Sequence, residues 1–373
     1  MNKLLNKIWF KGKAHLKQML VESRRVTICL DGWTKKGLTS SFLGISACFY
    51  DPKANTARHV ILDLTQLHHP HTGEQLAAEL SSCLKDWSID KDKVMLIVTD
   101  NGANIVKAIR ILRENQFENE PSTAADGDCI EDVEMNDEDE NDDVPIDNDE
   151  QNGSDLNDFQ LPLNVRYRRM QCMAHTLQLI IKRVYKHYVP VLEKAKHLVF
   201  KIRKSSIAVQ MLLAKCGKTV IADNITRWNS TYQMAKRLIE IKSFVNEVLN
   251  SILVDSLRIE EWARLEEMTN LLEPFAVQTD LLQTDSTSIS SIIPALLDLE
   301  CHLEQFPHAK TLTRSLLTDI HERFATILNP SYPDFNPLPA AACLLDPNYG
   351  ALLFTPDGRI LLEPTKTFIV HEV

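Results

Sequence analysis

The stretch VTICLDGW at residues 26–33 decides the fold, together with the run KVMLIVT at residues 93–99. Both runs are rich in β-branched residues, and an aspartate in a glycine-containing turn stands at the end of each: Asp31 in DGW and Asp100 in DNG. We predict a strand from each run. The second run lacks alternation of apolar and polar residues, which indicates a strand buried on both faces.

The segment between these two runs predicts how their strands are connected. Two further apolar runs, at 41–51 and 58–67, follow the first over short links, which favours an antiparallel meander. A capping-box pattern at 72–75 then begins a helix. A strand reached through a helical crossover is most simply parallel to an earlier one. A second helix follows at 105–112, and this order of elements opens a ribonuclease-H-like fold, although other α+β domains share it.

An acidic segment separates this α/β part from the later sequence. No Lys or Arg occurs between Arg113 and Arg166, although more than a third of the chain's 51 acidic residues lie there. The segment also has almost no apolar side chains, so their burial cannot offset the chain entropy that folding would cost. We therefore predict a disordered insertion at 114–162. Although the net charge of the whole chain is −10, the sequence outside this segment is basic, which suits a phosphate-rich partner.

The later sequence has the apolar periodicity of helices. A stripe at residues 177, 180, 181 and 184 predicts one helix, and a stripe at 192, 195, 199 and 202 predicts the next. No apolar run is long enough to cross a membrane. We therefore expect an α/β plus all-α chain in five parts: a helical lead-in at 1–25, the first part of the core at 26–113, the acidic insertion at 114–162, a helical region at 163–340, and a partial return to the core at 341–373.

Asp31 and Asp100 are the candidate catalytic and metal-binding residues. If their strands are parallel neighbours, both carboxylates emerge at the same edge of the sheet. Shared carboxylates of this kind hold the two Mg²⁺ or Mn²⁺ ions of an in-line phosphoryl transfer. The alternative for each aspartate alone is an ordinary Asp-Gly turn.

Each of two other short patterns allows both a functional and a purely structural interpretation. Cys172 and His175 could form half of a zinc site, but no second pair with ligand spacing follows them, so we favour local packing and predict no zinc site. Arg227 suits a phosphate and Trp228 suits stacking on an unpaired base. The alternative for Trp228 is a core residue that anchors a helix.

Five blocks in this order resemble the successive motifs of hAT-superfamily transposases and of the BED-type zinc-finger proteins derived from them: DGWT (31–34), TDNGAN (99–104), CMAHTLQL (172–179), TRWNSTYQM (226–234) and LLDPNY (344–349). The resemblance implies a ribonuclease-H-like core interrupted by a helical insertion domain, DNA as partner and a nuclear location. It assigns Asp31 and Asp100 to the first two carboxylates of an Asp-Asp-Glu triad. It also points to Trp228 as the residue that holds a flipped base, and to Cys172 and His175 as structural or DNA-positioning residues.

The departures from the family pattern leave the function open. We find neither the BED finger expected before the core nor the C-terminal dimerisation segment, whose Ser-Glu-Arg block supplies the third carboxylate, so self-association also stays open. We therefore expect a catalytically incomplete protein that acts as a nuclear nucleic-acid- or protein-binding factor. Two alternatives remain: an active Mg²⁺-dependent transposase whose third carboxylate comes from a longer isoform, and an inactive fragment.

Overall fold

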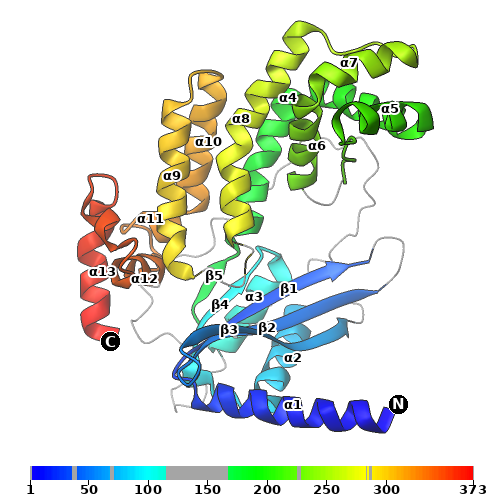
Figure 1. Ribbon diagram of the computed structural model, residues 1–373. Helices are drawn as coiled ribbons and strands as arrows, with labels where there is room; N and C mark the ends of the chain where they lie inside the picture. The colour runs from blue at the N-terminus through cyan, green and yellow to red at the C-terminus, as the bar shows by residue number, and fades with distance from the viewer. Residues whose placement is uncertain are drawn as a thin grey trace. The chain divides into compact units, whose positions relative to one another are not determined.

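The computed structural model describes residues 2–35, 40–67, 71–114, 167–224, 228–282, 284 and 288–372. They form two compact units, Met1–Cys172 and Met173–Val373. Figure 1 draws the first unit in blue to cyan, apart from its green strand at 169–171, and the second in green to red. Apart from Glu114, the predicted acidic insertion at 114–162 lies outside the described residues, and so does Arg227.

The first unit is built on a five-stranded sheet in the order β3-β2-β1-β4-β5 (Figure 1). Its first three strands form the predicted antiparallel meander, whereas β4 is parallel to both β1 and β5. The mixed sheet with its helices confirms the predicted fold class, a ribonuclease-H-like core beside a helical region. The elements of this unit are α1 (Asn2–Glu22), β1 (Val26–Thr34), β2 (Ser41–Asp51), β3 (Thr56–Leu67), α2 (Gly73–Asp86), η1 (Lys91–Lys93), β4 (Val94–Thr99), α3 (Ala103–Glu114) and β5 (Arg169–Gln171).

The core of this unit lies between the sheet and its helices. Alternate residues in the first half of β1 are buried, and the apolar stripes of the two predicted helices, α2 and α3, are buried with them in one cluster. The predicted cap of α2 is present, because Thr72 Oγ1 accepts a hydrogen bond from the backbone N–H of Gln75 at 3.3 Å. Trp87, at the end of α2, donates from Nε1 to the carbonyl of Leu62 in β3 at 3.0 Å, which ties the helix to the sheet edge.

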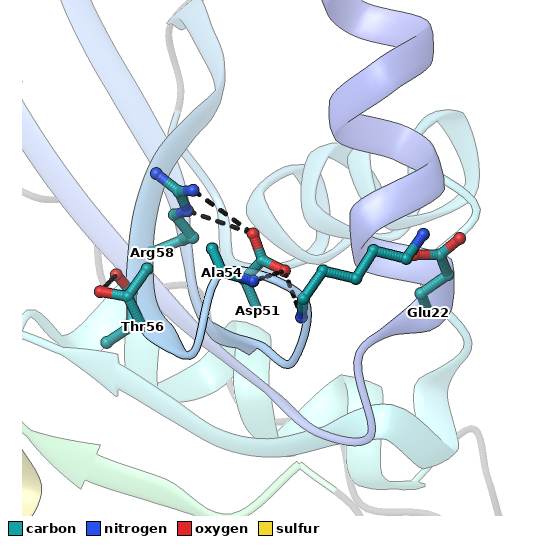
Figure 2. A network of polar contacts seen from close by, with 7 residues as sticks. Glu22, Asp51, Ala54, Thr56 and Arg58 are labelled. Atoms are coloured by element: carbon teal, nitrogen blue, oxygen red, sulfur yellow. Dashed lines mark hydrogen bonds and ion pairs between the residues drawn. The ribbon is translucent and has the colours of Figure 1, made fainter.

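Asp51 closes the hairpin between β2 and β3 (Figure 2). Its Oδ1 accepts hydrogen bonds from the backbone N–H groups of Lys53 and Ala54 at 3.0 and 3.2 Å, and its Oδ2 lies 3.4 Å from the Arg58 guanidinium. Burial disfavours the ionised form, but these donors outweigh it and lower the pKa of Asp51. Lys53 also pairs with Glu22 at 2.7 Å, so the turn is fastened to the end of α1.

The second unit is entirely helical in its described residues. Its long helices α4, α8, α9 and α10 pack side by side, and α6 packs on α4 and α8 (Figure 1). None of the described helices is both long and apolar enough to cross a membrane. The elements are α4 (Met173–Lys204), α5 (Ser206–Cys216), α6 (Trp228–Glu240), α7 (Lys242–Ser251), α8 (Ile259–Leu282), η2 (Ile289–Ser291), α9 (Ile292–Gln305), α10 (Lys310–Arg323), α11 (Ala325–Leu328), α12 (Leu338–Leu345), η3 (Gly350–Phe354) and α13 (Arg359–Glu372).

Helix α4 differs from the sequence prediction, which divided it into two helices. Pro190 lies inside a continuous helix, although proline removes one backbone hydrogen bond and costs about 3 kcal/mol in a helix interior. The buried stripe continues past it without a change of phase, from Tyr188 through Val191 and Leu192 to Ala195. Burial of this stripe offsets the cost of the proline. The sequence prediction also missed β5, because it treated the chain from about residue 165 as helical.

The last helices pack within the second unit. Cys343 of α12 and Leu361 of α13 belong to a small core that also includes Ile293 at the start of α9. Asp346 follows α12 and accepts a hydrogen bond from Ser290 Oγ at 2.7 Å. The structure thus describes residues 338–372 as a helical subdomain on α9 and η2, whereas the return of 341–373 to the sheet core stays a prediction.

Candidate carboxylate site

The register of the two central parallel strands brings Asp31 and Asp100 to neighbouring positions. Cys29 of β1 is paired with Val98 of β4. Asp31 follows Cys29 by two residues and lies inside β1, which continues to Thr34, so the turn predicted at Asp31 is wrong because DGW stays paired with β2. Asp100 follows Val98 by two residues and comes directly after the end of β4. Because both strands run in the same direction and side chains alternate with a period of two, the register aligns Asp31 with Asp100 at one edge of the sheet. Asp31 is exposed and Asp100 is half-buried.

A glycine of β2 leaves space beside Asp31 of β1. Gly44 stands directly opposite Asp31 in the antiparallel register. A Cβ at Gly44 would lie 3.2 Å from Cζ3 of Trp33, so only glycine leaves full room for the indole ring there. The ring also stacks on Phe42, with centroids 5.9 Å apart and an interplanar angle of 25°, and 44% of Trp33 is exposed. An exposed aromatic surface therefore lies beside the first carboxylate.

Asp100 lies in a tight turn between β4 and α3. Its Oδ1 accepts a hydrogen bond from the backbone N–H of Gly102 at 3.1 Å, which is the geometry of an Asx turn. A Cβ at Gly102 would lie 3.3 Å from that same oxygen, closer than most real Cβ contacts. Glycine in the DNG sequence therefore lets the backbone approach the carboxylate.

Arg169 of β5 holds the turn from its other side, and sequence reasoning did not single it out as a site residue. It donates from Nε to Thr99 Oγ1 at 2.8 Å, and from Nη2 to the carbonyl of Asp100 at 2.5 Å and to Asn101 Oδ1 at 2.7 Å. Burial lowers the pKa of the Arg169 guanidinium, while the nearby Asp100 carboxylate acts in the opposite direction. The contacts join residues about 70 positions apart, so no local pattern could have indicated them.

Cys29 precedes Asp31 by two residues and lies on the same face of β1. Its hydrogen bond with the Cys48 thiol, together with burial, raises its pKa well above the ordinary range. Cys29 is therefore a neutral thiol at physiological pH and adds no charge beside the carboxylate.

The donor set at this edge fits a hard divalent cation. Mg²⁺ in proteins is commonly bound by one or two carboxylates and completes its octahedral shell with water and phosphate oxygens. Asp31 and Asp100 supply two such carboxylates. Within the part of the chain that the structure describes, no group of three or more His, Cys, Asp or Glu side chains is arranged to hold a metal ion.

The other predicted site residues lie elsewhere. Cys172 directly follows β5, and its backbone N–H donates to the carbonyl of Thr99 at 2.6 Å. His175 lies half-buried in the first turn of α4. The DNA-positioning role that the resemblance implies for this pair stays a prediction.

Trp228 is the first residue of α6 and is only 8% exposed. Its ring lies 6.4 Å from that of Tyr232, and its carbonyl accepts a hydrogen bond from Tyr185 Oη at 2.7 Å. These contacts are those of a residue that anchors a helix. Its base-holding role stays a prediction, as does phosphate binding by Arg227, which lies outside the described residues.

Family comparisons match both units. The family described as the ZBED1 RNase-like domain matches residues 29–128, and the ZBED1 RNase-like helical domain matches residues 170–271. Together they cover more than half of the chain. The first match includes Asp31 and Asp100, and the second includes Cys172, His175 and Trp228.

Three relatives are similar over long stretches. A Zea mays protein named "Putative AC transposase" is 24% identical over 92% of this chain and 38% of its own length. Zinc finger BED domain-containing protein 4 of Homo sapiens is 26% identical over 55% of this chain and 18% of its own length. A "Putative transcriptional regulator" of Talaromyces stipitatus is 24% identical over 78% of this chain and 33% of its own length. The chain thus spans well under half the length of these relatives.

Proposed function

The chain belongs to the transposase-like family that derives from hAT transposases and includes the BED-type zinc-finger proteins, and from this premise we propose that it binds DNA and a divalent cation. The cation, Mg²⁺ or Mn²⁺, is held between Asp31 and Asp100. The observation that carries the proposal is the register of β1 and β4, which aligns these two carboxylates. Asp31 and Asp100 would hold the cation, which when bound would supply positive charge for a phosphate oxygen of the DNA.

The protein's own residues contribute to DNA binding in two ways. Lys and Arg outnumber Asp and Glu outside the acidic segment, which supplies attraction to the phosphate backbone. The exposed ring of Trp33 lies beside Asp31 and offers a surface for stacking an unpaired base. We accordingly propose that the DNA approaches the part of the sheet where Asp31 lies in β1 and Asp100 follows β4.

The proposal is limited to binding. Cleavage in the family uses a third carboxylate, and the described residues bring only two to this edge. The alternative function, metal-dependent DNA cleavage, relies on the same two aspartates. We also propose a nuclear location, in keeping with the relative named as a transcriptional regulator and with the BED-type relative. A fluorescently tagged chain distributed evenly between cytoplasm and nucleus would contradict that location.

Mn²⁺ titration followed by electron paramagnetic resonance tests the cation site. Asp31→Asn and Asp100→Asn should each weaken binding at least about tenfold, because each removes one charged ligand. Asp346→Asn is the matched control, since this carboxylate lies in the helical unit and is held by Ser290 and Asn348. Equal Mn²⁺ affinity in the wild type and in both site variants would overturn the proposal.

DNA binding is measured by fluorescence anisotropy with a labelled oligonucleotide between 50 and 200 mM salt. We expect affinity to fall steeply with salt, because phosphate contacts release counterions. Absent or salt-insensitive binding would remove the DNA part of the proposal. Incubation of the same DNA with Mn²⁺ distinguishes the alternative, because cleavage that Asp31→Asn abolishes would extend the function from binding to catalysis.

A further inference from the structure

The guanidinium of Arg169 contacts three successive residues at the end of β4. Its acceptors are the hydroxyl of Thr99, the backbone carbonyl of Asp100 and the side-chain carbonyl of Asn101, at 2.8, 2.5 and 2.7 Å. A planar fork of donors suits several acceptors in fixed directions, whereas a lysine ammonium behaves as a point charge. The backbone on both sides of the Asp100 side chain is therefore fixed by one residue of the neighbouring strand.

Gln171 of β5 and the residues on either side of the strand make three further contacts with the turn and with β4. Gln171 Oε1 accepts a hydrogen bond from Asn101 Nδ2 at 3.2 Å, so the Asn101 amide is held at both of its polar atoms. The backbone also contributes, because Cys172 N donates to the carbonyl of Thr99 and Ile97 N donates to the carbonyl of Arg168. The short strand β5 thus serves as a brace for the residues around the second carboxylate.

The direction of the Arg169 donors matters for a cation site. They are directed to a hydroxyl, a backbone carbonyl and an amide oxygen, and none of these three bonds goes to the carboxylate of Asp100. Oδ1 of this carboxylate accepts a hydrogen bond from the Gly102 N–H, and Arg169 takes up none of its lone pairs through these three bonds. A direct salt bridge from the Arg169 guanidinium to the Asp100 carboxylate would instead have neutralised the charge that a cation needs.

We propose that Arg169 is a positioning residue of the candidate carboxylate site, which fixes the backbone at Asp100 so that its carboxylate stays aligned with Asp31. The inference rests on the proposed function for the identity of the ligand, a divalent cation. The brace itself is a property of the metal-free chain. Residues that orient the ligands of a metal in this way typically change its affinity by about 10- to 100-fold when they are replaced.

Arg169→Lys is the decisive variant, because it keeps the positive charge and removes the fork. A change in Mn²⁺ affinity therefore cannot come from a change in charge beside Asp100. We expect affinity to fall about tenfold. Arg113→Lys is the matched control: Arg113 donates from Nε to the carbonyl of Tyr167 at 3.0 Å and so fastens the same strand at its other end, away from Asp100. Its Mn²⁺ affinity should stay within about twofold of wild type.

A second readout needs no metal. Amide hydrogen exchange at Gly102, whose N–H donates to Asp100 Oδ1, reports whether the turn is held. We expect the amide of Gly102 to exchange about tenfold faster in Arg169→Lys than in wild type. In Arg113→Lys the exchange rate should stay unchanged. Asn101→Ala, which removes one acceptor on an exposed side chain, should act in the same direction and safeguards the test if Arg169→Lys does not fold.

The two readouts separate the two proposals. A wild-type chain that binds no Mn²⁺ overturns the cation site, while faster exchange at Gly102 would still support the brace. Unchanged exchange at Gly102 in both Arg169→Lys and Asn101→Ala overturns the positioning role, whatever happens to Mn²⁺ affinity. Equal effects of Arg169→Lys and Arg113→Lys on both readouts overturn it as well, because they would reflect anchoring of β5 in general.

Discussion

Arg113 donates a hydrogen bond from Nε to the backbone carbonyl of Tyr167 at 3.0 Å, although 54 positions separate the two residues. Arg113 belongs to the last turn of α3, and Tyr167 leads into β5. Tyr167 is buried and has a left-handed backbone with a φ of 57°, which is uncommon for a large side chain and persists where its surroundings fix it. The described residues on either side of 115–166 therefore lie close together in the first unit.

Replacement of residues 115–166 by a Gly-Ser linker of about six residues should leave the first unit folded. The linker has only a short gap to bridge between Arg113 and Tyr167, and loop-closure entropy changes slowly with loop length. Far-UV circular dichroism should keep its amplitude, and the melting temperature should stay within a few degrees of wild type. Loss of cooperative melting would show that the acidic segment contributes to the fold.

Trp33→Ala should weaken binding of single-stranded DNA about 5- to 150-fold, the effect of about 1–3 kcal/mol for one stacked base. The cost in stability should be small, because 44% of Trp33 is exposed. Gly44→Val should weaken DNA binding in the same way, since a side chain there displaces the indole ring. Tyr50→Ala is the control: Tyr50 is an exposed aromatic at the other end of β2. Comparable losses for Tyr50→Ala and Trp33→Ala in fluorescence anisotropy would argue against a specific stacking site.

Glu261→Gln should lower the melting temperature at pH 7 by about 2–4 °C. Glu261 pairs with Lys194 and accepts hydrogen bonds from the backbone and guanidinium of Arg258, and these donors lower its pKa to about 2. Because the folded-state pKa lies below that of the unfolded chain, the stabilisation is full above about pH 4.3 and disappears as the pH falls towards 2. The difference between variant and wild type should therefore shrink over that interval.

Glu260→Gln is the matched control for this titration, because Glu260 lies in the same first turn of α8 and is exposed. It should melt close to wild type at every pH. A difference between Glu261→Gln and wild type that stays constant from pH 7 to pH 2.5 would mean that ionisation of Glu261 is not the source of the stabilisation.

The parts of the fold that the sequence predicts correctly are those set by local periodicity. Strands β1 and β4 and helices α2 and α3 follow directly from the residue patterns that predict them. The parallel pairing of β1 with β4 was predicted from the helical crossover, and the alignment of Asp31 with Asp100 follows from it. A three-residue strand such as β5, with the sequence Arg-Met-Gln, is too short for a periodic pattern, and only its pairing with β4 defines it.

The remaining features of the site depend on contacts that are distant in sequence. No local pattern predicts the role of Arg169, because its acceptors precede it by about 70 residues. The stacking of Trp33 on Phe42 could have been predicted from the short link between β1 and β2, once their antiparallel register is assumed. The two apolar stripes at 177–184 and 192–202 predict two helices, whereas the structure has one, because the periodicity of each stripe does not show that burial continues past Pro190.

Trp228→Ala should destabilise the helical unit by about 3–5 kcal/mol, the usual cost of truncating a large buried aromatic. The prediction follows from the 8% exposure of Trp228 and from the contact of its ring with Tyr232. Urea unfolding followed by circular dichroism measures it, with Trp33→Ala as an exposed tryptophan for comparison. Trp228→Phe should recover much of the loss, because it restores most of the buried volume. If Trp228→Ala unfolds at the same urea concentration as wild type, the ring is not needed for packing, and the base-holding role implied by the family resemblance becomes the better explanation of this residue.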